Sequence, residues 1–98
     1  MNNETIAAHA PTAAECERLD WLYLGGQMQS WYDAYVAMRG RHYADLALKA
    51  NIEQLKDQVA NFRQFARGSL AVDMWTYYAD KYLVKLTALR AVQAEVAK

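Results

Sequence analysis

Apolar residues three and four positions apart form two stripes along the second half of the chain. The first stripe, within about residues 41–67, consists of Leu48, Ile52, Leu55, Val59, Phe62 and Ala66. The second, within about residues 70–97, consists of Val72, Trp75, Ala79, Tyr82, Leu86, Leu89, Gln93 and Val96. Because this spacing gathers the members of a stripe on one helix face, it predicts an antiparallel helical hairpin in which Phe62 lies near Trp75.

The junction between the two stripes carries helix-end signals. Arg67 suits the negative end of a helix dipole, and Gly68 suits the left-handed position that follows a helix. Ser69 suits the N-cap of the next helix. These three residues predict a short turn between the helices of the hairpin.

An N-terminal helix is expected over about residues 13–24. Thr12 and Glu15 have the spacing of a capping box, in which each side chain accepts from the backbone N–H of the other residue. Gly25 and Gly26 are the expected end. A single long helix through both glycines is the alternative, but each glycine costs about 1 kcal/mol inside a helix, which favours a break. Residues 1–11 are expected to be a flexible tail.

A further apolar stripe crosses these glycines and reaches the middle of the chain. Its members are Trp21, Leu24, Met28, Trp31, Tyr35, Met38 and His42. Gly40 and a slip of register between His42 and Leu48 indicate two helices, about 27–39 and 41–67. With no alternation typical of strands, the chain is expected to be all-α: residues 12–98 form a single helical domain, a three- to four-helix bundle.

The helices of this bundle differ greatly in length. Helices of such unequal length do not close a compact core alone, so a homodimer or a tight complex with another protein is expected to complete it. A break at Gly40 weakens this argument, because four short helices could close a bundle by themselves.

The twelve aromatic residues fall into two blocks, within 21–43 and 62–82. Their positions point in several directions around each helix, so some should face solvent or a partner. Tyrosine and tryptophan are enriched in interface hot spots. The residues expected to bind a partner protein are Trp31, Tyr32, Tyr35, Tyr77 and Tyr78. The alternative is a small core built from large side chains.

Four arginines suggest a second kind of site. A phosphate or nucleotide could bind the cations together with neighbouring rings, and the candidates are Arg39, Arg41, Arg63 and Arg67. Since Asp45, Glu53 and Asp57 interrupt any continuous basic stripe, a solvated helix face is the favoured interpretation.

Residues typical of catalysis or metal binding are few. His42 and Asp45 share a helix face, which we interpret as a partly buried histidine beside an acid. Cys16 lies between two glutamates, which oppose a reactive thiolate, and its spacing suggests a small core residue. No nucleophile elbow, phosphate loop or Glu-x-x-His motif occurs. We therefore expect no enzyme, no cofactor and no metal.

Eleven basic and eleven acidic residues give a net charge of zero. The zero is a cancellation: residues 1–35 carry five acids and one base, and residues 36–98 carry ten bases and six acids. Opposite charges could guide the first third onto the hairpin of its own or another subunit. No strong positive field exists to attract nucleic acid or a membrane, and no apolar run approaches a membrane helix. A cytoplasmic location is expected.

No motif identifies a family. The favoured hypothesis is a non-catalytic helical protein-interaction module that binds, and blocks or regulates, a partner protein. Size class alone suggests an inhibitor or antirepressor of phage or mobile-element type. The alternatives are an oligomer that binds a small ligand or nucleotide through Arg39, Arg41 and aromatic residues, and an assembly chaperone or adaptor.

Overall fold

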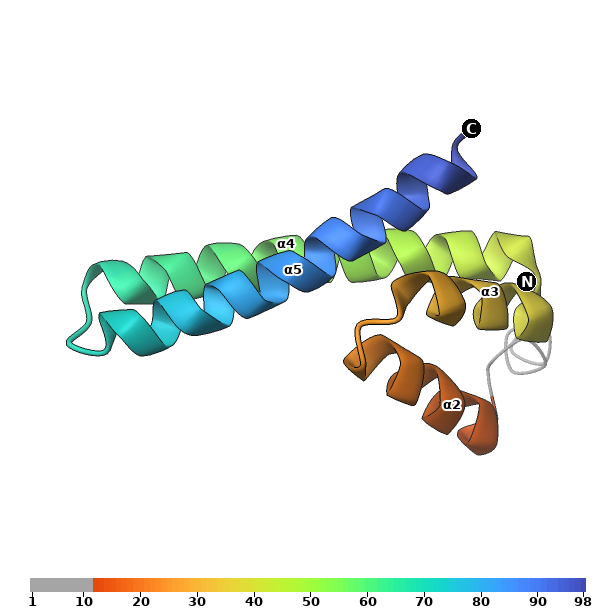
Figure 1. The fold of residues 1–98 in the computed structure, drawn as a ribbon, viewed down its shortest axis with the longest axis horizontal. Coiled ribbons are helices and arrows are strands. Elements are labelled where there is room, and N and C mark those ends of the chain that lie inside the picture. Colours follow the sequence, from red (N-terminus) through yellow and green to blue (C-terminus); the bar gives the residue numbers. More distant parts are fainter. Residues whose placement is uncertain (1–11) are drawn as a thin grey trace, which may run out of the picture. The chain divides into compact units, whose positions relative to one another are not determined.

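The computed structural model describes residues 12–98, which form four α-helices and no strand (Figure 1). The helices are α2 (Ala13–Leu24), α3 (Met28–Arg39), α4 (Arg41–Arg67) and α5 (Val72–Val96). The predicted all-α fold and the predicted helices are confirmed. The tail expected over residues 1–11 lies outside the described residues.

The chain divides into two units, Met1–Leu46 and Ala47–Lys98, whose border lies within α4. The described part of the first unit contains α2, α3 and the first turns of α4. The second unit contains the rest of α4 and α5. Each unit is described by itself below, and the single domain expected over residues 12–98 stays a prediction.

Helix α2 is bounded by two local motifs that the sequence predicts. The backbone N–H of Glu15 donates to the Thr12 hydroxyl (3.2 Å), and the N–H of Thr12 donates to the Glu15 carboxylate (3.0 Å). At the other end the N–H of Gln27 donates to the carbonyl of Leu22, and Gly26 adopts a φ of 77°. This pattern is a Schellman motif, which favours glycine at the left-handed residue. The helix therefore breaks at the glycines, as expected.

A second glycine separates α3 from α4. Gly40 has φ 87° and ψ 163°, a conformation open to glycine and costly for other residues. Its N–H still donates to the carbonyl of Val36, which completes the last turn of α3. The prediction of two helices that meet at Gly40 is confirmed.

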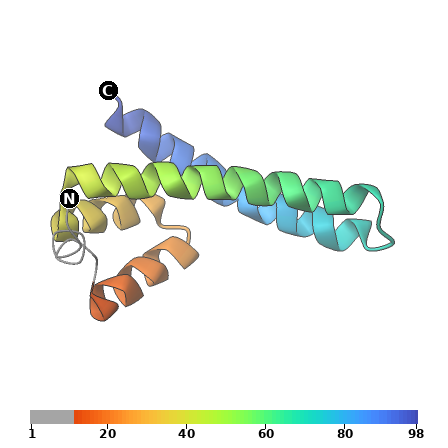
Figure 2. The same cartoon turned by 180° about the vertical axis from the view of Figure 1, so that it is seen from behind.

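The second unit is a hairpin in which α4 and α5 run side by side from their connecting turn (Figures 1 and 2). The Phe62 ring stacks on Trp75 at 5.7 Å and on Tyr82 at 5.3 Å between centroids. This contact confirms the predicted pairing of the two stripes. The buried residues of this unit are Leu48, Ile52, Leu55, Val59, Ala79, Leu86, Leu89 and Val92.

Four details of the hairpin differ from the prediction, the first being that Val72, expected in the seam, is 46% exposed. Helix α5 begins at Val72, because the Ser69 hydroxyl accepts from the N–H of Ala71 in the turn and does not cap the helix. Positive φ angles among the described glycines occur at Gly26 and Gly40, so Gly68 is not left-handed. Val92 is buried while Gln93 is exposed. A step of three after Leu89 keeps an apolar side chain in the seam, and the polar amide stays in water.

Candidate partner-binding surface

Large apolar side chains are exposed at the end of α4 and the start of α5. The turn that joins these two helices is seen in Figure 1. These side chains share a short stretch of chain and range from 38% exposed at Tyr78 to fully exposed at Leu70. We call this set the tip cluster, and its members are Phe65, Leu70, Val72, Met74, Tyr77 and Tyr78.

The rings of the tip cluster are held by neighbouring rings. Phe65 packs on Trp75 with centroids 5.2 Å apart, and Tyr77 meets Tyr78 edge to face at 5.4 Å. Tyr78 also lies 5.9 Å from Phe62, whose ring stacks within the seam. Such contacts restrict the rotamers of exposed rings, so that a partner would bind them at a lower entropic cost.

The three other aromatic residues expected to bind a partner lie in the first unit and are covered. Trp31 and Tyr32 are 4% and 6% exposed, and Tyr35 is half-buried. Trp31 meets Tyr23 of α2 and Tyr35 edge to face, at 5.6 and 5.8 Å. Tyr32, next in sequence, donates its hydroxyl to Asp45 of α4. Trp31 and Tyr32 are both buried because α2 packs on one side of α3 and the start of α4 packs on another. A single apolar stripe in the sequence does not reveal this second contact.

The hydrogen bond between Tyr32 and Asp45 is 2.5 Å long. Burial, reinforced by this bond to a carboxylate, raises the pKa of the Tyr32 hydroxyl.

His42 is exposed, with its ring 5.3 Å from that of Tyr43. The expectation of a partly buried His42 is therefore wrong: α3 covers Asp45 in part, through the hydrogen bond from Tyr32, but leaves His42 exposed.

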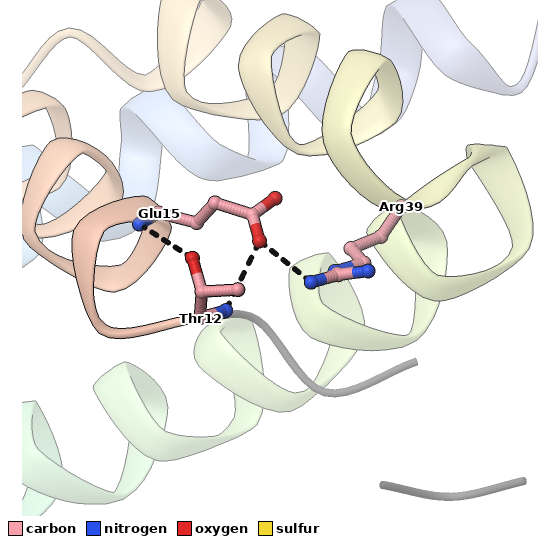
Figure 3. Close-up of polar contacts among 3 residues, drawn as sticks. All are labelled: Thr12, Glu15 and Arg39. Carbon is pink, nitrogen blue, oxygen red and sulfur yellow. Dashed lines mark hydrogen bonds and ion pairs between the residues drawn. The ribbon is translucent and has the colours of Figure 1, made fainter. Parts of the chain in front are cut away.

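Arg39 joins the end of α3 to the start of α2 (Figure 3). Its guanidinium donates to the Glu15 carboxylate at 2.6 Å, and both side chains are largely covered. The carboxylate oxygen that accepts from Arg39 also accepts from the N–H of Thr12. Hydrogen bonds from Thr12 first, and then the charge of Arg39, lower the pKa of Glu15. Arg39 thus has a structural role within the first unit.

The candidate anion-binding arginines form two pairs rather than one group. Arg41 is exposed, with its Nε 3.8 Å from an oxygen of Asp45. Arg63 and Arg67 are one turn apart on α4 in the second unit, where they border an open hollow of about 380 Å³ with Ala60 and Gln64. This second pair is the one that leaves room for a small anion.

The outer face of α2 is a surface that the sequence analysis misses. Trp21 and Leu24 are 74% and 70% exposed, although the stripe places them in the core. Cys16 is also exposed, which corrects its assignment as a small core residue. The helix instead buries Leu19 against the rest of its unit. An open hollow of about 640 Å³ lies along the exposed face, and its described lining is Ala13, Cys16, Glu17, Asp20, Trp21, Leu24 and Gly25.

Within residues 12–98, no group of three or more histidine, cysteine, aspartate or glutamate side chains is placed to hold a metal ion. Over the same range, no helix has the length and apolar content needed to cross a membrane. Comparisons of the chain with protein-family models, with curated proteins and with solved structures find no match. A proposal for the function therefore starts from the exposed surfaces described above.

Proposed function

We propose that the protein is a non-catalytic helical interaction module that binds a partner protein through the tip cluster and thereby blocks or regulates it. The observation that carries the proposal is the exposure of six large apolar side chains around one turn. Contiguous exposed apolar side chains on a soluble protein typically mark interaction sites.

The composition of the tip cluster supports a protein as the partner. It combines Phe65, Tyr77 and Tyr78 with aliphatic side chains and Met74, and Tyr, Phe and Met are enriched at protein interfaces. Arg63 and Arg67 lie on the last turns of α4 and could supply polar contacts at its rim. By contrast, Trp31 and Tyr32 serve the core of the first unit, so we leave them out of the proposed surface.

Affinity capture with matched variants tests the proposal. A tagged Leu70→Ser, Tyr78→Ser double variant should lose a partner that the wild type retains, because both changes remove exposed apolar surface from the tip cluster. Leu46→Ser is the control, since Leu46 is also exposed but lies in the first unit. If the double variant and the control captured the same proteins as the wild type, the tip cluster would not be the binding surface.

The kind of partner rests on size class, which favours an inhibitor or antirepressor of phage or mobile-element type acting in the cytoplasm. An assembly chaperone or adaptor would use the same surface. These roles differ in their consequence. An inhibitor lowers the activity of the captured protein in a purified assay, whereas a chaperone raises the yield of its assembled form.

Binding of a small anion or nucleotide is the second candidate function. The open hollow beside Arg63 and Arg67 supports it, whereas the ion pair between Arg39 and Glu15 argues against the site expected at Arg39 and Arg41. A thermal-shift screen with phosphate and nucleotides tests this candidate. A stabilising compound whose effect is lost in Arg63→Ala would support it, and the absence of any stabilising compound would remove it.

A further inference from the structure

Helix α5 carries a second stripe of residues besides the one in the hairpin seam. Alternating steps of four and three relate the members Tyr77, Lys81, Val84 and Ala88. The first three are exposed, and Val84 is 70% exposed despite being apolar. This spacing is typical of a helix face that packs against another helix. We call these four residues the outer stripe of α5.

The exposed face of α2 has the same spacing. Ala13, Glu17, Asp20 and Leu24 follow one another at steps of four, three and four, and all four are exposed. They belong to the lining of the open hollow along this helix, together with Trp21. Both stripes cover eleven residue steps, which is about 16 Å of helix.

Set antiparallel, the two stripes match in chemistry as well as in length. Leu24 then meets Tyr77, Asp20 meets Lys81, and Ala13 meets Ala88. Glu17 meets Val84 and lies next to Lys85, which follows Val84 in sequence. Three of the four pairs therefore match in this register, one acid with a base and two apolar or small side chains with each other, while Glu17 finds its base, Lys85, beside Val84.

We propose that α2 of one copy of the protein packs antiparallel on the outer stripe of α5 of a second copy. The reciprocal contact of the other α2 and α5 closes a twofold dimer. This inference specifies the two faces of the homodimer that the sequence leads us to expect, and it does not rest on the tip cluster, with which it shares only Tyr77.

Pairing of like helices fits the charges less well. Two α5 helices packed through their outer stripes would bring Lys81 of both copies close together, and two α2 helices would do the same with Glu17 and Asp20. Like charges that face each other are unfavourable. The contact of α2 with α5 removes both problems and covers Trp21 and Leu24 of each copy.

The distribution of charge over the described residues agrees with this arrangement. Residues 12–46 carry five acids and three bases, and residues 47–98 carry eight bases and five acids. A contact between the acidic unit of one copy and the basic unit of the other lowers the electrostatic energy of the pair. The dimer should therefore weaken as salt is added.

Charge reversal followed by mixing tests the proposal, with mass measured by light scattering after size exclusion. The wild type should be a dimer, and Asp20→Lys and Lys81→Glu should each weaken dimerisation about tenfold or more. Mixing the two variants should restore the dimer, because both contacts of the mixed pair then join opposite charges. Asp57→Lys, a reversal at an exposed site of α4, should leave the dimer intact.

Oxidation of a cysteine variant supplies a second measurement. In the proposed register Cys16 of one copy lies on the same flank of the contact as Thr87 of the other, which is exposed, so Thr87→Cys should form reducible dimers, whereas the control Arg90→Cys should not. A wild type that is monomeric at about 100 µM would overturn the proposal, as would a mixture of the charge variants that stays monomeric. Since none of these changes alters the tip cluster, partner capture would survive that failure.

Discussion

Leu89 and Leu70 lie on the same hairpin in opposite environments. Leu89 is fully buried in the seam, and Leu70 is fully exposed at the tip. The same substitution, leucine to alanine, should therefore have very different effects on the free energy of unfolding. This comparison tests whether the seam, and not the tip, holds the hairpin together.

The expected magnitudes follow from burial. Replacing a buried leucine by alanine removes apolar contacts and leaves a cavity, at a cost of about 2–5 kcal/mol. A domain of this size loses about 4–8 °C in melting temperature for each kcal/mol. Leu89→Ala should thus melt at least about 8 °C below the wild type. Leu70→Ala should change stability by no more than about 0.5 kcal/mol, as is usual for surface substitutions.

Thermal and urea unfolding followed by circular dichroism measure both values, and dilute protein keeps self-association from contributing. Equal destabilisation by the two substitutions would refute the account, because it would mean that Leu70 is covered. A Leu89→Ala variant as stable as the wild type would equally refute it, because the seam would then not be the core of the hairpin.

Three other predictions concern local contacts. Because the folded pKa of Glu15 is lowered, its stabilising contribution is present above about pH 4.5 and lost as the pH falls further; Glu15→Gln should flatten this acid limb in pH-dependent unfolding. Because the folded pKa of the Tyr32 hydroxyl is raised, the stability that it contributes is present below about pH 10 and is lost as the pH rises further. Tyr32→Phe should remove this alkaline loss of stability, and it should cost about 1 kcal/mol at neutral pH because the hydrogen bond to Asp45 is missing. Gly40→Ala should destabilise by about 1–3 kcal/mol because alanine disfavours a positive φ, while the control Gly68→Ala, whose φ is not positive, should have little effect in the same assay.

The sequence predicts the helices well because their limits depend on local chemistry. The capping box of Thr12 and Glu15 involves residues three positions apart, and a break at Gly25 and Gly26 follows from backbone preference. The turn at Ser69 was harder, because a hydroxyl can accept from several nearby N–H groups, and the choice depends on the path of the whole turn.

The proposed binding surface could be predicted only in part, because exposure depends on packing between helices. Tyr77 and Tyr78 are exposed as expected, whereas Trp31 is buried by helices that pack on two sides of α3. The opposite happens at Trp21 and Leu24, which the sequence predicts to be buried and the structure shows exposed. Their spacing fits a core stripe, but α2 turns another face toward its neighbour, and periodicity alone does not tell which apolar face is covered.

Photo-crosslinking in cells tests the central claim most directly. A photoreactive phenylalanine analogue placed at Tyr78, in the tip cluster, should give one dominant adduct with another protein. The same analogue placed at Leu46, which is exposed but outside the cluster, should not give that adduct. No adduct at Tyr78, or the same adducts from both positions, would contradict the proposal that the tip of the hairpin binds a partner.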